Sequence, residues 1–483
     1  MIRKSLIVFF VIIYAQIGCS QNAFKVLFQN PLDEWVSDIA EGANNTYYAV
    51  GGSGYNFQPW DFRGLAYRMR SSSDTLSRHI SFNDTVTRFF KIVKDQGNDF
   101  LVIGTICNPP EYNERLLIAG MDTNLNILWR KEYQLKEYDR FWKIEYFRKN
   151  ENSIIVFGDI GLDSLGGQQD LFFAEITYSG DTIKTGYYLP HNPYVHTGTF
   201  NSDSSRIWIF GEGFDYNGRG ERAEFDTNFL IRRIDWLPVV VDGYSNARWY
   251  SDNKMLFMGR YTVDYTPQDD DVGISFMDTA LNTPVIHYFG SQDTIDYPGA
   301  ERCFDFKDTN HIFFTGTHNI IFDFYPQGVS WLMAGLLDHD LNTVYYYLYG
   351  GDAYYIASSI LATSDGGSII AATRYDYRTQ YNERDNYFLK LDQYGLITSS
   401  GSPKELVSTT IQLYPNPGTD NIRLLGVSEG TLELYAADGR EVLTRQIDKE
   451  SNIISVSKLP SGYYYYRIFD KHKIEFTGKW VKM

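Results

Sequence analysis

The six residues YYAVGG at positions 47–52 are the first copy of a motif that returns along the whole chain. Apolar and aromatic residues run into a glycine in FLVIGT (100–105), IIVFGD (154–159), IWIFGE (207–212), MLFMGR (255–260) and IFFTGT (312–317). A seventh copy, SIIAAT (368–373), has alanine at that place. The anchor residues, spaced by 48 to 57 positions, are Gly51, Gly104, Gly158, Gly211, Gly259, Gly316 and Ala372. A repeat of this length indicates a fold built from equivalent units.

Each unit contains four short strands. A strand such as FFKIVKD (89–95) precedes the anchor, and LLIAGMDTNLN (116–126) and ILWRKEY (127–133) follow it. Four strands in about 50 residues predict an all-β protein with a β-propeller body, because sheets that stack radially bury both of their faces. We predict seven blades, with six or eight as the range, and a linear β-solenoid as the alternative.

The chain also predicts how the ring closes. The segment FKVLFQNPLDEW (24–35) matches LWRKEYQLKEYDRFW (128–142) in register and spacing, and the latter stretch holds a fourth strand that enters the next unit. We therefore predict that residues 24–29 complete the last blade, which removes an open sheet edge.

Composition excludes several classes of protein. The 483 residues include 60 acidic and 44 basic side chains, so the net charge of −16 argues against nucleic-acid binding. Aromatic residues make up 16% of the chain, which is unlike a disordered acidic segment. Three cysteines are too few for a disulfide scaffold.

Residues 1–20, MIRKSLIVFFVIIYAQIGCS, are typical of an export signal. Arg3 and Lys4 precede ten apolar residues, a run too short to span a bilayer, and cleavage is expected before Gln21. Lipidation at Cys19 is the competing interpretation. No later segment has 18 consecutive apolar residues, so the sequence predicts no transmembrane segment.

The repeat ends near residue 400. We expect the β-propeller to cover 21–400, a linker 401–408, and a small antiparallel β-sandwich 409–483. The C-terminal part contains IQLYPNPGTDNIRL (411–424), LELYAADGREVL (432–443), ISVSKLPSGYYYYRIFD (454–470) and FTGKWVKM (476–483), in which apolar alternation and turn residues predict strands.

These C-terminal residues resemble the type A C-terminal sorting domain of the type IX secretion system of Bacteroidota. The matching positions are Tyr414, Pro415, Asn416, Pro417, Asp438, Gly439, Gly462, Lys479 and Lys482. The resemblance implies two partners, the outer-membrane translocon and a sortase-like peptidase. It also implies secretion, or a cell-surface location, after signal-peptide export to the periplasm. An ordinary β-sandwich binding module is the alternative.

Long connections between the second and third strands are expected on one face of the ring, at 53–63, 105–115, 159–170, 212–227, 260–272, 317–330 and 373–386. They carry a net charge of −11 and many tyrosines, and exposed loops on a rigid scaffold are common binding sites. Rings with carboxylates and arginines suit a glycan or a peptide. The candidate ligand-binding residues are Tyr55, Trp60, Asp61, Arg63, Tyr216, Arg219, Tyr261, Arg374 and Tyr377. A solvated acidic rim is the alternative.

Clusters of side chains with oxygen ligands are weak candidate sites for Ca²⁺, although no cofactor is predicted. The candidate ligands are Asp215, Asn217, Glu221, Asp269, Asp270 and Asp271. None of the runs has the twelve-residue spacing of an EF-hand, and charged loop tips are the alternative interpretation.

Common catalytic motifs do not occur in the sequence: it has no His-Glu-x-x-His, no Gly-x-Ser-x-Gly and no Cys-x-x-Cys. No catalytic residue is assigned. We expect an exported, non-enzymatic propeller that binds a glycan, a peptide or a protein. The alternatives are a secreted hydrolase, glycosidase- or peptidase-like, that uses carboxylates on the long-loop face, and a structural spacer.

Overall fold

The computed structural model describes residues 23–54, 62–82, 85–95, 97, 99–109, 113–135, 140–161, 169–188, 193–214, 220–237, 242–265, 268–282, 286–291, 294–323, 325–379, 383–397, 412–414, 419, 421–425, 430–436, 440–447, 453–470 and 475–482. The regular elements in these ranges are all β-strands. The predicted signal peptide, with Cys19, and the predicted linker lie outside the described residues.

Seven antiparallel sheets make up the described residues up to 391. Sheet 1 contains β2 (Asp33–Glu41), β3 (Tyr47–Gly54), β4 (Arg63–Met69) and β5 (Thr75–Ile80). Sheet 2 contains β6 (Val86–Lys94), β7 (Phe100–Cys107), β8 (Arg115–Met121) and β9 (Ile127–Tyr133). Sheet 3 contains β10 (Arg140–Arg148), β11 (Ser153–Gly161), β12 (Gln169–Thr177) and β13 (Thr182–Tyr188). Sheet 4 contains β14 (Tyr194–Phe200), β15 (Arg206–Glu212), β16 (Gly220–Asp226) and β17 (Ile231–Trp236).

Sheet 5 contains β18 (Asp242–Ser251), β19 (Lys254–Tyr265), β20 (Gln268–Asp278) and β21 (Ile286–Phe289). Sheet 6 contains β22 (Tyr297–Pro298), β23 (Phe304–Phe306), β24 (Ile312–His318), β25 (Trp331–Leu337) and β26 (Thr343–Gly350). Sheet 7 contains β27 (Tyr354–Ala362), β28 (Ser368–Tyr375), β29 (Asp385–Leu391) and the N-terminal β1 (Phe24–Phe28). The seven motif copies all lie in the strand next to the inner edge of their sheet, and in sheet 6 this is β24, with which both β22 and β23 pair. We count β22 and β23 together as the first strand of sheet 6.

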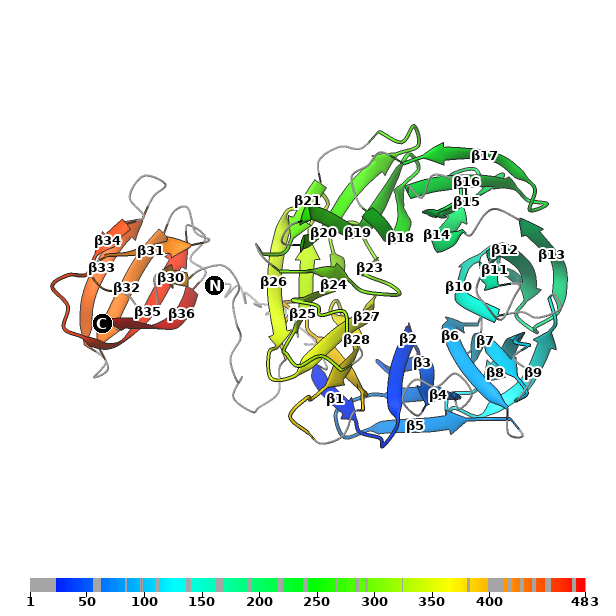
Figure 1. The fold of residues 1–483 in the computed structure, drawn as a ribbon, viewed down its shortest axis with the longest axis horizontal. Helices are drawn as coiled ribbons and strands as arrows, with labels where there is room; N and C mark the ends of the chain where they lie inside the picture. The colour runs from blue at the N-terminus through cyan, green and yellow to red at the C-terminus, as the bar shows by residue number, and fades with distance from the viewer. Residues whose placement is uncertain are drawn as a thin grey trace, which may run out of the picture.

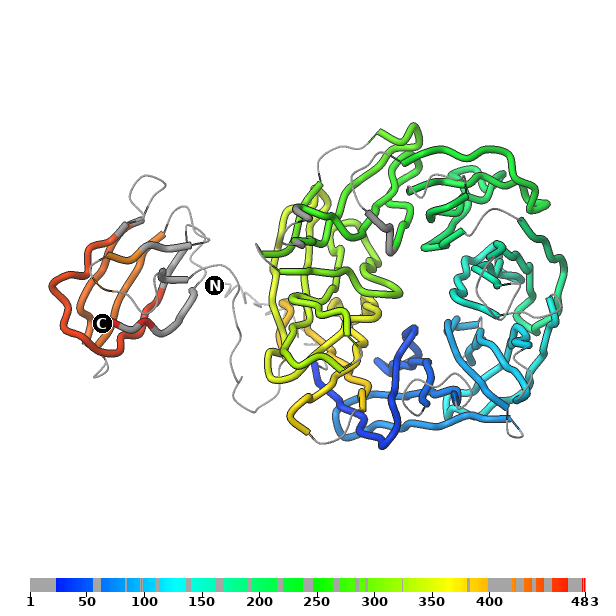
Figure 2. Tube along the Cα trace, viewed as in Figure 1, coloured from blue at the N-terminus to red at the C-terminus, as the bar shows by residue number. Residues whose placement is uncertain are grey.

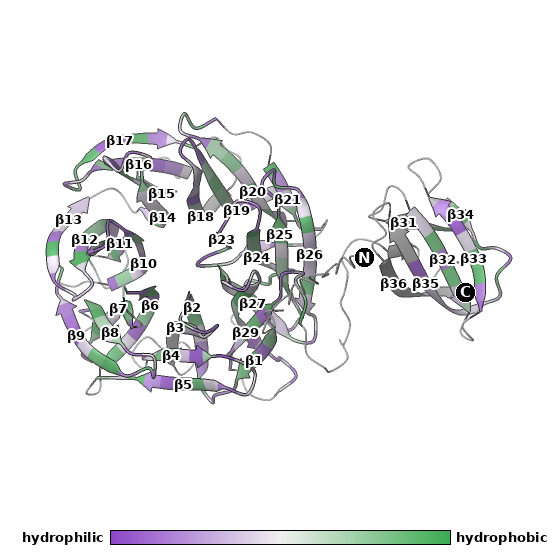
Figure 3. Cartoon of the chain, turned by 180° about the vertical axis from the view of Figure 1, so that it is seen from behind, coloured by the Kyte–Doolittle hydropathy of each residue, from purple (hydrophilic) through white to green (hydrophobic). Residues whose placement is uncertain are grey.

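The sheets stand around a common centre, and each runs outward from an inner strand such as β2 or β6 to an outer strand such as β5 or β9 (Figure 1). Middle strands β7 and β8 are almost entirely buried, whereas β5 presents several exposed polar residues, and Figure 3 shows this contrast in hydropathy. The described body is therefore an all-β, propeller-like ring.

The N-terminal strand lies at the outer edge of the last sheet. β1 pairs antiparallel with β29, with Phe24 opposite Lys390 and Phe28 opposite Asn386. Figure 2 shows this blue N-terminal segment beside the yellow end of the ring. The sheet thus combines the first described strand of the chain with three strands that lie more than 300 residues later, which joins the two ends of the ring.

Each pair of neighbouring sheets shares one hydrophobic core. Phe89, Ile92 and Val102 of sheet 2 pack with Val50 and Ala66 of sheet 1, for example. Corresponding clusters join sheets 2 and 3, 3 and 4, 4 and 5, 5 and 6, and 6 and 7. A further cluster joins sheet 7 to sheet 1. Apolar burial between all neighbours around the circle is the main contribution that stabilises a ring of this kind.

The anchor glycines are required by the close approach of the inner strand. A Cβ atom added to Gly51 would lie 1.9 Å from the carbonyl oxygen of Trp35, and one added to Gly104 would lie 2.2 Å from that of Arg88. Gly158 and Gly211 meet inner-strand carbonyls at 2.0 and 2.1 Å in the same way. The repeated glycine of the motif therefore marks a position at which no side chain fits beside the backbone of the neighbouring strand.

Next to this contact, most inner strands contain a β-bulge. The register shifts by one residue at Ser37, Phe90, His196, Ser245 and Ser358, directly after the residue that pairs with the anchor. In sheet 6 the same place holds five residues, 299–303, between β22 and β23. A bulge bends its strand and redirects the extra residue, and the longer insertion in sheet 6 extends this effect toward the ring's centre.

The C-terminal region forms two further sheets. One contains β30 (Gln412–Tyr414), β31 (Asn421–Leu425) and β34 (Ile453–Ser455), and the other contains β33 (Glu441–Ile447), β32 (Gly430–Ala436), β35 (Gly462–Asp470) and β36 (Glu475–Lys482). Ile422 and Ile454 of the first sheet share a core with Leu432, Tyr464 and Trp480 of the second.

Candidate functional site

The loop face is the side of the ring on which the second strand of each sheet connects to the third. Several side chains that the sequence places on this face lie outside the described residues, namely Tyr55, Trp60, Asp61, Asp215, Tyr216, Asn217 and Arg219. The remaining candidates are described, and their contacts indicate what each side chain can do.

Arg374, near the end of β28, is held by neighbours within sheet 7. Its Nε donates to the hydroxyl of Tyr355 at 3.1 Å, and its Nη2 lies 3.3 Å from Asp352 and 3.4 Å from Asp376. Only 15% of its side chain is exposed. Tyr377 follows in the loop. Arg374 therefore fixes the beginning of the loop, and its charge is already matched.

Sheet 5 corrects one predicted loop. We expected residues 260–272 to form a long connection, but β19 continues to Tyr265 and β20 begins at Gln268, so most of this stretch is an extended hairpin. The polarity of this acidic run is typical of a loop. Two neighbouring strands, however, pair through backbone hydrogen bonds, which do not depend on the polarity of the side chains. Tyr261 consequently lies on a strand, and its ring packs on Tyr288 with centroids 4.4 Å apart.

Arg63 and Glu221 also lie in strands. Arg63 begins β4 and is exposed. The predicted loop 212–227 already contains β16 from Gly220, and Glu221 is fully buried there. One of its carboxylate oxygens accepts a hydrogen bond from the backbone N–H of Phe214 at 2.6 Å. Glu221 thus ties the start of the loop to the strand.

The acidic run of sheet 5 places carboxyl groups close together. Added at Gly290, a Cβ atom would lie 1.7 Å from Asp271 Oδ1 and 2.8 Å from Asp296 Oδ2, so these two oxygens lie near one point. Burial, followed by repulsion from Asp296, Asp269 and Asp270, raises the pKa of Asp271 to about 6. Across the described ranges, no three His, Cys, Asp or Glu side chains are arranged to hold a metal ion.

The insertion 299–303 of sheet 6 reaches across the centre of the ring. Its backbone pairs with β27 of sheet 7, through Glu301 N–H to Ser358 O at 2.9 Å and Ile360 N–H to Arg302 O at 2.8 Å. Arg302 forms an ion pair with Asp38 of β2 and donates to the carbonyl of Ile39 at 2.9 Å. Residues from sheets 1, 6 and 7 therefore meet at the axis.

Sheets 2 and 3 join the same network. Lys91 of β6 lies 2.8 Å from Glu145 of β10 and 3.0 Å from Glu301, and its side chain is 4% exposed. Lys143 lies 3.6 Å from Glu145 and 3.9 Å from Glu301. Burial alone would lower the pKa of Lys91, but the carboxylates of Glu145, Glu301 and Asp38 outweigh it and raise the pKa. We call these side chains the axial network. It contains three acidic residues, Asp38, Glu145 and Glu301, and three basic residues, Lys91, Lys143 and Arg302, so the numbers of the two kinds are equal.

Exposed aromatic side chains occur on the loop face of each of sheets 3 to 6. We call this set the aromatic arc, and it consists of Trp142, Tyr194, Trp236, Tyr288 and Phe322, each 43% to 63% exposed. Inner strands begin at the loop face and outer strands end there, which places Trp142 and Tyr194 at the starts of β10 and β14, and Trp236 and Tyr288 at the ends of β17 and β21. Phe322 lies between β24 and β25.

The opposite face differs in the kind of apolar residue it exposes. Near its turns, the described residues of the ring expose Leu128, Ile183, Leu230, Val344 and Tyr394. Four of these five are aliphatic, whereas the described part of the loop face exposes five aromatic residues and the two aliphatic residues Val263 and Ile321. Sequence reasoning missed the arc because it searched the long loops, whereas most arc residues lie at strand ends. An aromatic residue near the start or end of a predicted strand was the available signal, since few further residues of that strand can cover it.

Three of the arc rings have a cationic or aromatic neighbour that restrains them. The Arg140 guanidinium lies 4.3 Å from the centre of the Trp142 ring, and the ring of Tyr288 packs on that of Tyr261. Phe322 contacts Tyr297 edge to face, with centroids 5.7 Å apart. These contacts hold flat apolar surfaces in place beside groups that form hydrogen bonds.

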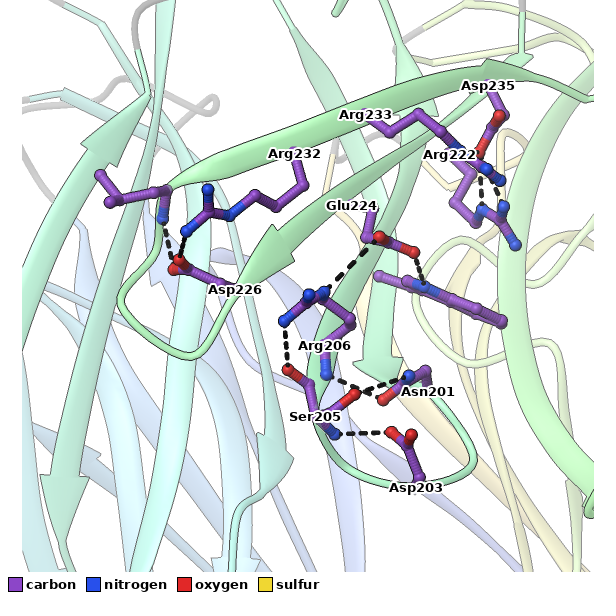
Figure 4. A network of polar contacts seen from close by, with 12 residues as sticks. Asn201, Asp203, Ser205, Arg206, Arg222, Glu224, Asp226, Arg232, Arg233 and Asp235 are labelled. Atoms are coloured by element: carbon purple, nitrogen blue, oxygen red, sulfur yellow. Dashed lines mark hydrogen bonds and ion pairs between the residues drawn. The ribbon is translucent and has the colours of Figure 1, made fainter.

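Sheet 4, in which Trp236 ends β17, also contains a polar network around Arg222, Glu224 and Asp235 (Figure 4). Asp235 accepts from Arg222 at 2.7 Å and from Arg233 at 2.8 Å. Arg222 is almost fully buried and lies 4.3 Å over the ring of Trp208, whose indole N–H donates to Glu224 at 2.9 Å. The Asp235 carboxylate is therefore fixed by two guanidinium groups.

The residues that resemble sorting motifs fall partly within the described strands. Tyr414 lies in β30, Gly462 begins β35, and Lys479 and Lys482 lie in β36. Lys482 is buried, and its ammonium group donates to the carbonyl of Thr419. Pro415, Asn416, Pro417, Asp438 and Gly439 lie outside the described residues.

Comparisons with known proteins separate the two parts of the chain. Residues 412–483 match the family model of the secretion system C-terminal sorting domain. No curated protein matches this sequence. Similar solved structures include the β-propeller domain of the Trilobed protease from Pyrococcus furiosus, at 10% identity and a TM-score of 0.43 over 77% of this chain and 99% of that chain. A mutant of NanB sialidase from Streptococcus pneumoniae is similar at 12% identity and a TM-score of 0.40, over 77% and 71%.

The matched tail indicates the cellular location of the protein. Within the described ranges, the structure contains no helix that is long and apolar enough to cross a membrane. The sorting domain implies a Bacteroidota source and a signal peptide, and it implies interaction with the type IX secretion machinery. The chain is type IX secretion cargo, exported through the outer membrane to the cell surface or the exterior.

Proposed function

We propose that the chain is a seven-bladed β-propeller over 21–400, followed by a linker at 401–408 and a β-sandwich sorting domain over 409–483. Seven shared cores, including the one between sheet 7 and sheet 1, support one closed ring in which each sheet is a blade. The common core of the two C-terminal sheets supports the sandwich.

The exported ring acts as a binding module for a glycan, a peptide or a protein, and it uses its loop face. The observation that carries this proposal is the aromatic arc. Large rings that are roughly half exposed leave apolar area in water, and a binding partner that covers them gains the hydrophobic contribution of that area. Tyrosine and tryptophan suit this role because they have few rotatable bonds and therefore lose little conformational entropy when a partner binds.

The alternative is a secreted hydrolase. Glycoside hydrolysis needs two carboxyl groups that flank the scissile bond and are open to substrate. The axial carboxylates Asp38, Glu145 and Glu301 each face a lysine or an arginine in the network that crosses the centre of the ring. Their engagement supports binding over hydrolysis.

The test uses the mature chain from Gln21 to Met483, fluorescently labelled, on glycan, peptide and protein arrays. We expect binding to at least one array, with loss of that binding in Trp142→Ala/Trp236→Ala. Tyr394→Ala, which removes an exposed ring from the opposite face, should bind like the wild type. Release of reducing ends or peptides from incubated polymers, without stable binding, would favour the hydrolase and overturn the proposal.

A further inference from the structure

We infer that the aromatic arc binds a neutral polysaccharide chain that extends across sheets 3 to 6, an inference that rests on the proposed binding function. The nature of the surface suits a sugar. Planar rings of Trp142, Tyr194, Trp236, Tyr288 and Phe322 are exposed on consecutive sheets. In a pyranose whose hydroxyl groups are equatorial, the faces of the sugar ring present C–H groups, which stack on such a plane while the hydroxyl groups remain free to form hydrogen bonds.

Three of the rings are already held in one orientation before a ligand binds. Tyr288 is packed on Tyr261, Phe322 on Tyr297, and Trp142 under the Arg140 guanidinium. Side chains that already occupy one orientation lose little further entropy when a ligand covers them. Sugars bind each ring weakly, so a surface that loses little conformational entropy on binding suits this class of ligand.

The ring carries a net negative charge. Glu212 lies 3.5 Å from His196, and Asp235 accepts from two arginines, so both carboxylates already have partners. The ring region 21–404 carries −18, so an anionic polymer is repelled. A neutral, hydroxyl-rich polymer avoids this repulsion.

The aromatic arc is wider than one sugar unit. Sheets 3 to 6 follow one another around the ring (Figure 1). Trp142 is on the first of these sheets and Phe322 lies between two strands of the last, so a single sugar cannot cover the whole arc. An extended chain that crosses several sheets can contact more than one of these rings, and several weak contacts on one polymer add to a useful affinity.

The experiment is affinity electrophoresis of the mature chain in gels that contain laminarin, xylan, mannan or dextran, with alginate as an anionic probe. We expect retardation by at least one neutral polymer and none by alginate. Trp142→Ala and Trp236→Ala should each weaken the retardation about tenfold, as truncation of a central ring in an interface does. Tyr394→Ala should leave it unchanged, and unaltered circular dichroism of all variants shows that they are folded.

The outcomes separate this inference from the proposed function. If a neutral polymer is bound equally by wild type and both tryptophan variants, the arc is not the site, although binding remains the function. If no neutral polymer retards the chain while a peptide or protein array reports a ligand, the inference of a polysaccharide ligand is wrong and the proposed binding function stands. If neither experiment finds a ligand, both proposals fail.

Discussion

Replacing Lys91 with methionine removes a positive charge from the centre of the ring while it keeps an unbranched side chain of similar length. The ammonium group lies 2.8 Å from Glu145 and 3.0 Å from Glu301 and is 4% exposed. Lys91→Met therefore leaves two partly buried carboxylates without their shared cation, with Lys143 as the remaining nearby cation at 3.6 and 3.9 Å.

The magnitude follows from this geometry. With an effective dielectric constant of about 20, opposite charges about 3 Å apart attract by roughly 5 kcal/mol, from which the cost of removing them from water must be subtracted. Removal of one partner from a buried ion pair typically costs about 3–5 kcal/mol. Because Lys143 partly compensates, we expect Lys91→Met to lower the free energy of unfolding by about 3 kcal/mol, the lower end of that range.

The assay is urea unfolding of the mature chain at pH 7, followed by tryptophan fluorescence. Eight of the nine tryptophans precede residue 400, so the signal reports mainly on the ring. The matched control is Lys131→Met, which removes an ion pair with Asp181 of comparable length, 2.5 Å, on the surface. That variant should unfold almost like the wild type because exposed ion pairs contribute little.

A double variant tests the reasoning itself. Lys91→Met/Glu301→Gln removes one of the two carboxylates that the single substitution leaves without their shared cation, so it should recover part of the lost stability. If Lys91→Met and Lys131→Met destabilise the protein equally, or if the double variant is the least stable of all, the axial network is not the electrostatic centre that the distances indicate.

Three further predictions concern the anchor, a titrating group and the tail. Gly51→Ala should destabilise the ring by about 2 kcal/mol or more, since the new Cβ would lie 1.9 Å from Trp35 O, whereas Gly97→Ala, with its nearest contact at 3.3 Å, should change the urea midpoint little. Burial raises the pKa of Glu34 to about 7, so the folded state retains a proton that the unfolded state loses, and stability falls as pH rises from about 4.5 to 7 by roughly 3 kcal/mol. Glu34→Gln should flatten that fall in midpoints measured from pH 5 to 8, and equal slopes would contradict it. Deletion of 412–483 should leave the protein in the periplasm on cell fractionation, and its appearance at the surface would refute the role of the tail.

The repeated motif contains enough information to predict strands and their order. The alternation of apolar residues and the spacing of the anchors from Gly51 to Ala372 place one motif in the second strand of each sheet. The match of residues 24–35 to a later unit predicts the closing strand, and β1 pairs with β29 in the structure. The sorting tail is also readable in the sequence, because its turn residues and strands follow one another along a short stretch.

The acidic hairpin of sheet 5 shows where local patterns mislead. Residues 269–271 are three consecutive aspartates, a composition typical of a loop, yet all three lie in β20. Strands are held by backbone hydrogen bonds to their neighbours, and the partner strand is already set by the preceding hairpin. Tyr261 therefore changes from a predicted loop residue to a strand residue that supports Tyr288.

Tertiary structure alone decided the centre and the exposed surface. The contact of Arg302 with Asp38 joins residues 264 positions apart, and that of Lys91 with Glu301 joins residues 210 apart, so no local pattern could pair them. Exposure of Trp142 or Trp236 likewise depends on which neighbouring strand ends first. Periodicity encodes which face of a strand is apolar, because that face must pack against the next sheet. The contacts across the axis and the rings left uncovered arise only when seven sheets close into a circle, since ring closure brings distant residues together.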